Sequence, residues 1–170
     1  MVNSFSPVLK KGASILILGS MPGKRSLQEA QYYAHPRNAF WRIFCTLFMR
    51  DKDWVDSIDN YQQKIECLKN ENIALWDVLQ SCTRKSSLDA DIVESSIVVN
   101  DFSKLFTDNQ SIKHIYFNGA KAEKLYKRYV IPTLSAQEKS LSMTRLPSTS
   151  PAHAAISFEK KLQEWKVICR

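Results

Sequence analysis

Glycine and cysteine are scarce in this chain, with four of each among 170 residues. A dinucleotide-binding loop needs three closely spaced glycines and a phosphate-binding P-loop ends in Gly-Lys-Ser/Thr, and the sequence contains neither pattern. Cys45, Cys67, Cys82 and Cys169 are scattered, with no CxxC and no histidine at zinc spacing. We therefore expect reduced thiols, no metal and no organic cofactor.

Long apolar segments are also missing. The strongest run, residues 15–18 with its neighbours, is too short to cross a bilayer, and the first six residues do not resemble a signal peptide. Hydrophobic residues make up 44% of the chain and charged residues 24%, which is ordinary globular composition. The sequence predicts one cytoplasmic domain over residues 1–170 that stays off the membrane, and we expect a monomer.

Acidic residues are concentrated in the middle of the chain. Residues 1–50 carry seven basic groups against one acid, residues 51–110 six against twelve, and residues 111–170 eleven against four. If the two basic ends meet in the fold, they form a positive surface suited to a phosphate backbone. Solvated helix faces are the alternative explanation, so charge supports nucleic-acid binding without establishing it.

Strand and helix patterns alternate along the chain. The β-prone runs are residues 13–18, 73–76, 114–117 and 142–146. The helical patterns cover residues 38–48, 54–69, 102–106, the segment from Gly119 to Tyr126, and a last helix from His153 or Ala154 to Val167. Residues 80–90 are expected to form a long loop. This alternation predicts a three-layer α/β/α sandwich around a central, mostly parallel four-stranded sheet. Sites in such folds form in the loops beyond the carboxyl ends of the strands.

Three motifs in those loops carry a family resemblance. They are Gly19-Ser20-Met21-Pro22-Gly23, Tyr33-Ala34-His35-Pro36-Arg37-Asn38-Ala39-Phe40-Trp41 and Leu146-Pro147-Ser148-Thr149-Ser150-Pro151. In this order they resemble the uracil-DNA glycosylase superfamily, most closely its hypoxanthine-DNA (deoxyinosine) branch and next its mismatch-specific uracil/thymine branch. The resemblance implies an α/β/α fold and a monofunctional, cofactor-free hydrolase. Such an enzyme flips a deaminated base out of DNA and cleaves its N-glycosidic bond with water.

The resemblance places Ser20, Met21 and Pro22 at the substrate. The mismatch-specific branch has a water-positioning asparagine where this chain has Met21, and methionine can neither orient nor deprotonate water. We therefore expect hypoxanthine to be favoured over uracil.

The second motif supplies the catalytic candidate. Asn38 resembles the asparagine assigned the catalytic role in the hypoxanthine branch, although spacing alone favours a helix N-cap. Tyr33 matches an aromatic residue that stacks on the extruded base, with core packing as its alternative role. His35 is either a pocket hydrogen-bonding group or a structural loop histidine.

Asp77 follows the strand that ends in Trp76, where the superfamily reads the base edge with an asparagine or another polar residue. As an ionised carboxylate it would accept from N1–H of hypoxanthine or N3–H of uracil, and it could not donate to the carbonyl. A turn aspartate at a strand end is the alternative.

The last loop resembles the one that pinches the DNA backbone and wedges the duplex. Ser148 replaces the histidine or asparagine of other branches, so we expect weaker stabilisation of the leaving base from this loop. Ser150 and backbone amides are candidate phosphate ligands, or the loop is only a rigid turn. The DNA-binding candidates are Lys24, Arg37, Lys121, Ser148, Ser150 and His153, with Arg25 beside them.

Two further functions stay open. Met21 and Ser148 are altered polar positions, so the chain could be a catalytically silent DNA-binding domain of the same fold. An unrelated α/β enzyme acting on a nucleotide or a small anion is the third reading.

No carboxylate pair can be assigned from the sequence, which favours direct attack by water over a covalent intermediate.

Overall fold

The computed structural model describes residues 1–48, 60–86 and 88–169. At its centre is a parallel sheet with strand order β3-β2-β6-β7, confirming the predicted sheet. The strands are β2 (Ile15–Gly19), β3 (Ile73–Asp77), β6 (His114–Asn118) and β7 (Ser142–Leu146). Every residue of β2 and β3 is buried, which explains why these runs are continuously apolar rather than alternating.

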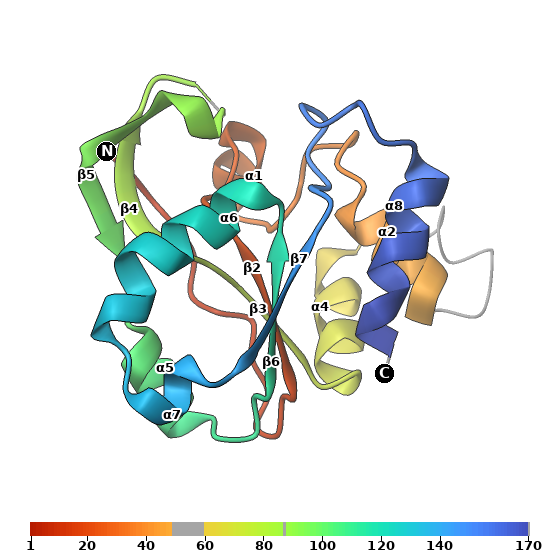
Figure 1. The fold of residues 1–170 in the computed structure, drawn as a ribbon. Coiled ribbons are helices and arrows are strands. Elements are labelled where there is room, and N and C mark those ends of the chain that lie inside the picture. The colour runs from red at the N-terminus through yellow and green to blue at the C-terminus, as the bar shows by residue number, and fades with distance from the viewer. Residues whose placement is uncertain (49–59, 87, 170) are drawn as a thin grey trace.

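Helices cover both faces of this sheet, as a three-layer sandwich requires (Figure 1). One face carries α2 (Phe40–Phe48), α4 (Tyr61–Asn70) and α8 (Phe158–Trp165), which continues as the turn Lys166–Cys169. The other carries α5 (Phe102–Asp108), α6 (Ala120–Leu125) and α7 (Ala136–Lys139), with turns at Tyr126–Val130 and Ile131–Thr133. The short α1 (Lys24–Glu29) follows β2 at the carboxyl edge of the sheet.

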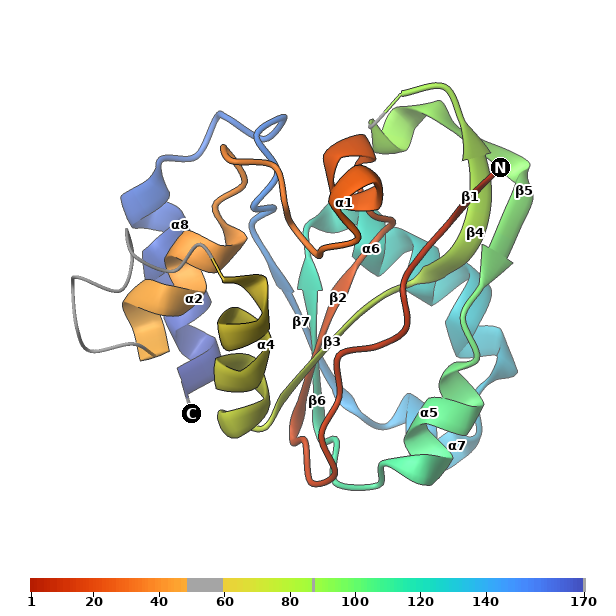
Figure 2. The ribbon, with the colours of Figure 1, turned by 180° about the vertical axis from the view of Figure 1, so that it is seen from behind.

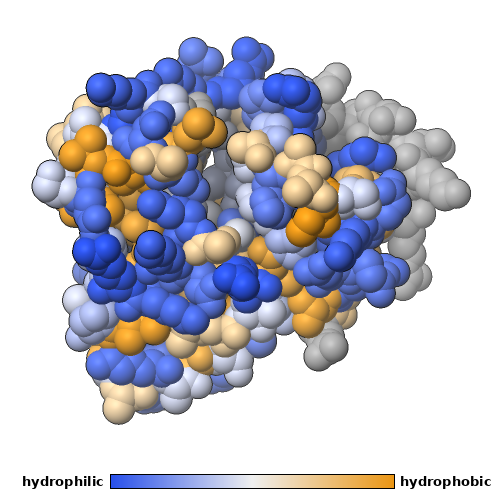
Figure 3. Space-filling view, turned by 45° about the horizontal axis from the view of Figure 1, so that its top comes forward, coloured by the Kyte–Doolittle hydropathy of each residue, from blue (hydrophilic) through white to orange (hydrophobic). Residues whose placement is uncertain are grey.

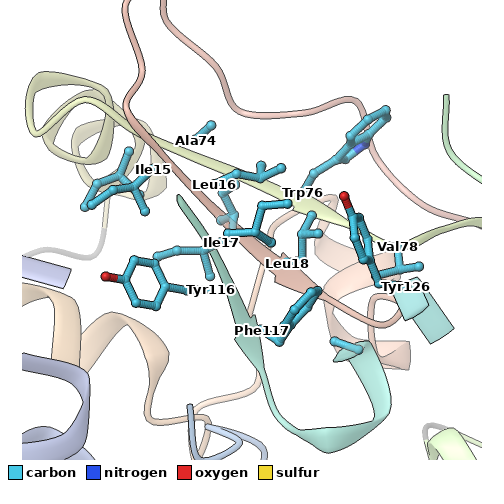
Figure 4. Packing of buried hydrophobic residues seen from close by; sticks show 14 of the residues in the cluster. Ile15, Leu16, Ile17, Leu18, Ala74, Trp76, Val78, Tyr116, Phe117 and Tyr126 are labelled. Atoms are coloured by element: carbon cyan, nitrogen blue, oxygen red, sulfur yellow. The ribbon is translucent and has the colours of Figure 1, made fainter. Parts of the chain in front are cut away.

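Consecutive residues of the central strands supply the two halves of the core. Tyr116 and Phe117 of β6 point to opposite sides (Figure 4). The Tyr116 hydroxyl donates to the carbonyl of Val167, which follows α8 in the sequence. The Phe117 ring packs against Tyr126, which follows α6. The sheet is therefore anchored on both faces, and this holds its carboxyl edge as a rigid platform for the loops.

The expected loop over residues 80–90 was wrong. β4 (Leu79–Arg84) and β5 (Ile92–Val99) form an antiparallel hairpin that pairs with β1 (Val2–Asn3), and the short turn Asp89–Asp91 lies between them (Figure 2). β4 is rich in polar residues and alternates irregularly between buried and exposed positions, so it lacks the apolar run that marks the central strands. The hairpin extends β3 past the sheet and brings its tip to the carboxyl edge.

Two helix boundaries differ from the predictions. The last helix begins at Phe158, because the Ser157 side chain accepts from the backbone N–H of Lys160 and caps it there. The expected start of the second helix, residues 54–59, lies outside the described residues; its described part is α4. No helix in the described ranges is both long and apolar enough to span a membrane.

Candidate active site

A cavity of about 820 Å³ opens at the carboxyl edge of the sheet. Figure 3 looks onto this edge and shows a hollow bordered mainly by hydrophilic residues. The cavity is lined by the loops that follow β2, β6 and β7, by Asp77 at the end of β3 and by the tip of the β4–β5 hairpin. Its volume falls in the range of sites for small organic ligands, so it can hold a nucleobase with its sugar.

Most of the predicted site residues line this cavity. They are Ser20, Met21, Pro22, Lys24, Tyr33, His35, Asn38, Asp77, Lys121, Ser148, Ser150 and His153. Arg37 is not among them: it is exposed, and its backbone N–H donates to His35 Nδ1 at 3.1 Å. The three motifs therefore converge because parallel strands bring their carboxyl ends to one edge. The individual roles remain predictions.

Gly19 allows two predicted substrate groups, Asp77 and Tyr33, to lie close to the backbone of β2. It ends β2 and is paired with Asp77 at the end of β3. A Cβ atom at Gly19 would lie 2.5 Å from Asp77 Oδ1 and 3.0 Å from Tyr33 Oη. Any side chain here would displace both groups, so the glycine is needed for close approach.

Asp77 is held inside the cavity wall. The residue is 3% exposed, and Ser4 Oγ donates to its Oδ2 at 2.7 Å. Burial raises the pKa of Asp77 to about 7, with a further contribution from the negative charge of Asp89, while the Ser4 hydrogen bond and Arg84 act in the opposite direction. With a pKa of about 7, Asp77 is a neutral acid below neutral pH and can then donate as well as accept, in contrast to the ionised carboxylate considered from the sequence.

Tyr33 has one ring face against the core and its hydroxyl in the cavity wall. Its backbone has φ +55°, and its ring stacks on Phe40 with centroids 4.2 Å apart. The buried Oη has no hydrogen-bond partner among the described residues. Core packing thus accounts for one face, and only the other face is left for a flipped base.

Asn38 lies two residues before the first residue of α2, whose backbone N–H it accepts from, and it also lines the cavity. Its Oδ1 accepts from the backbone N–H of Phe40, the first residue of α2, at 2.9 Å. Because that donor fixes which end of the amide is oxygen, the Nδ2 group is the end left to donate. In the described part of the chain we find no acceptor for it. Helix capping and catalysis are therefore compatible.

The first motif is tied to the β4–β5 hairpin. Ser20 Oγ donates to both carboxylate oxygens of Asp89, at 2.7 and 2.8 Å, and Arg84 donates to the carbonyl of Pro22. Met21 is 6% exposed and contributes only apolar wall. Asp89 lines the cavity with Asp77, so the structure brings together two carboxyl groups that could not be assigned as a pair from the sequence. No motif singles Asp89 out, since it is 69 residues from Ser20 in a segment expected to be a loop.

The last loop is rigid. Asn118 and Thr149 exchange two hydrogen bonds, of 2.8 and 2.9 Å, and Trp165 Nε1 donates to the carbonyl of Pro147. Lys161, buried under the loop, donates to the carbonyl of His153 at 2.8 Å. Asn118, at the end of the third strand, was not singled out as a site residue, although its position in the fold was a sufficient signal. A fixed loop of this kind can present its edge to a DNA backbone without further ordering.

Cations surround the cavity. Its lining includes Lys24, Arg25, Lys121 and Arg145. Arg25 and Arg145 also pair with glutamates, Glu29 and Glu123. Lys24 and Arg25 come from the basic segment 1–50, and Lys121 and Arg145 come from the basic segment 111–170, so the two basic ends of the sequence do meet at this edge. Among the described residues, no three histidine, cysteine, aspartate or glutamate side chains are grouped as a metal site would require.

Comparison with known proteins agrees with this geometry. The family model described as the uracil DNA glycosylase superfamily matches residues 6–169. A protein named hypoxanthine DNA glycosylase from Methanosarcina barkeri is 41% identical over 118 residues, covering 69% of this chain and 71% of the relative. One of the same name from Methanosarcina acetivorans is 34% identical over 166 residues, covering 98% and 96%.

A solved structure has the same fold. The solution NMR structure of a candidate uracil DNA glycosylase from Methanosarcina acetivorans superposes with a TM-score of 0.77 at 33% identity. The match covers 97% of this chain and 94% of that one. The chain belongs to the uracil DNA glycosylase superfamily.

Proposed function

We propose that this protein hydrolyses the N-glycosidic bond of a deaminated base in DNA, with hypoxanthine favoured. The observation that carries this proposal is the cavity in which Asp77 and Asn38 lie together under a rim of cations. Two relatives named hypoxanthine DNA glycosylase support the choice of base. The proposed protein is a cytoplasmic monomer with one domain over residues 1–170, and its four free cysteines fit a reducing compartment.

The chemistry requires charge stabilisation rather than a strong protein nucleophile. As the C1′–N bond breaks, positive charge develops on the sugar and negative charge on the departing base. Asn38 Nδ2 is placed to donate to the base or to the attacking water, and a water-excluding cavity strengthens such hydrogen bonds. Flipping the nucleotide costs a few kcal/mol, less for a poorly paired base such as hypoxanthine.

The lactam edge of hypoxanthine fits a neutral Asp77. This edge offers an N1–H donor beside the O6 acceptor, and a protonated carboxyl group presents the complementary acceptor and donor. Uracil has the same edge, and so do guanine and thymine, so Asp77 discriminates only against adenine and cytosine, whose edges lack the N–H donor beside a carbonyl. The preference between hypoxanthine and uracil must come from Met21 and the shape of the cavity.

Base release from a panel of duplexes tests the substrate. Duplexes containing hypoxanthine, xanthine or uracil are incubated with the protein and treated with alkali to cleave abasic sites, with undamaged duplex as control. We expect hypoxanthine to be released faster than uracil, because Met21 provides no amide to hold the water used in the uracil branch. Faster release of uracil would assign the chain to uracil repair, and binding without release of any base would make it a silent DNA-binding domain.

DNA binding should depend strongly on salt and little on flanking sequence. Each phosphate neutralised contributes about 0.9 to the negative slope of log affinity against log salt. Lys121→Gln, at the cavity rim, should make the slope shallower by about this amount, whereas Lys104→Gln on α5, paired with Asp108, should leave it unchanged. Affinity that does not change between low and physiological salt would remove the case for phosphate contacts.

A further inference from the structure

The first motif contains no acid or amide that could act on water. Met21 stands where the mismatch-specific branch has its water-positioning asparagine, and its side chain is buried apolar wall. A cationic sugar is stabilised by a nearby carboxylate, and an attacking water must lose a proton. If the proposed function is right, a carboxylate from another part of the chain can serve these needs.

The β4–β5 hairpin places Asp89 in the cavity beside the first motif. It lies in the turn Asp89–Asp91 at the hairpin tip and lines the cavity together with Ser20 and Asn38. The Ser20 hydroxyl lies within 2.8 Å of both of its carboxylate oxygens, which fixes the carboxylate beside Met21. The hydrogen bond from Arg84, the last residue of β4, to the carbonyl of Pro22 ties the tip end of the hairpin to the same motif.

The environments of Asp77 and Asp89, which both line the cavity, favour different charge states for the two carboxyl groups. Asp77 is buried, with the Ser4 hydroxyl as its hydrogen-bond donor, and carries the pKa of about 7. Burial also raises the pKa of Asp89, but the Ser20 hydrogen bond and the positive charges of Arg84 and Lys121 act in the opposite direction. Two coupled acids in one cavity do not ionise together easily, so the better-solvated and better-paired Asp89 is the one that ionises first.

We propose that Asp89 is the catalytic carboxylate of this site, stabilising the cationic sugar and accepting a proton from the attacking water. In this step the water oxygen bonds to C1′ while the C1′–N bond breaks and its electron pair leaves with the base. Asp89 takes the proton of the water and later releases it to solvent, and the departing base takes up a proton in turn. Ser20 is a positioning residue, because it acts through Asp89. This inference rests on the proposed glycosylase function.

Single-turnover release of hypoxanthine from duplex DNA tests the role of Asp89. Asp89→Asn keeps the size of the side chain and an acceptor for Ser20, and it should lower the rate at least 100-fold with DNA affinity changed less than threefold. Ser20→Ala should lower the rate less, by about tenfold. Asp91→Asn, in the same turn and outside the cavity lining, is the matched control and should keep the wild-type rate.

The pH profile separates a base from a structural residue. The wild-type rate should rise with pH on an acid limb of unit slope as Asp89 ionises, and that limb should be absent in Asp89→Asn, whose fold is checked by thermal unfolding. If the variant misfolds, the acid limb of the wild type decides: its absence overturns the proposal. A rate for Asp89→Asn within threefold of Asp91→Asn also overturns it, while the glycosylase function stands. A wild-type protein that releases no base overturns the proposed function and this inference with it.

Discussion

Replacing Asn38 with alanine should lower the single-turnover rate of hypoxanthine release by about two to three orders of magnitude, with little change in DNA affinity. The reason is that one positioned hydrogen-bonding group in a transition-state site typically contributes about that much to the rate. In this site the contribution comes from the Nδ2 group, because Oδ1 is occupied by the backbone N–H of Phe40. The measurement is a rapid-quench time course with protein in excess over an inosine-containing duplex.

A matched control separates catalysis from helix capping. Asn60 accepts from the backbone N–H of Gln62 at the start of α4 at 2.9 Å, the same local bond as that of Asn38, and it does not line the cavity. Both alanine variants should lose about 1 kcal/mol of unfolding free energy. Only Asn38→Ala should lose the rate. Equal stability losses with less than a tenfold difference in rate would leave Asn38 as a cap and nothing more.

The central sheet could be predicted because its strands are buried on both sides. Runs such as residues 15–18 must be continuously apolar to lie between two helical layers, and this pattern is visible in the sequence. The β4–β5 hairpin could not be predicted in the same way. Its strands have one solvent-facing side and irregular register, so Leu79–Arg84 carries polar residues at positions where a strand pattern would be sought.

The motif residues of the site could be placed because each follows a central strand. Ser4, Arg84 and Asp89 could not, since pairing between distant segments brings each of them to a motif or cavity residue. Ser4 follows β1 and contacts Asp77, whereas Arg84 and Asp89 belong to the hairpin and contact Pro22 and Ser20. The charge state of Asp77 could not be predicted from the sequence either. A carboxyl group titrates according to its burial and its neighbours, and neither is specified by an aspartate at a strand end.

Asp77→Asn should stabilise the folded protein at pH 8 and leave its stability nearly unchanged at pH 4. In the unfolded chain the carboxyl group ionises near its ordinary pKa of 3.8, whereas in the folded protein the pKa is about 7. Folding therefore takes up a proton between these values, and the stability of the wild type falls as the pH rises through this window. Above pH 7 the loss is complete and amounts to about 4 kcal/mol, on the basis of 1.36 kcal/mol per pKa unit.

The asparagine variant does not lose stability in this way, because its side chain does not ionise between pH 4 and pH 8. Its oxygen can still accept from Ser4, and its amide group can donate toward the cavity. The measurement is urea unfolding of both proteins from pH 4 to pH 8, with Asp108→Asn on α5 as an exposed control that should change stability by less than about 0.5 kcal/mol. A variant less stable than the wild type at pH 8 would mean that Asp77 is a stabilised carboxylate. The proposal that a neutral Asp77 hydrogen-bonds to the lactam edge of the base would then be wrong, because an ionised Asp77 could only accept from the base.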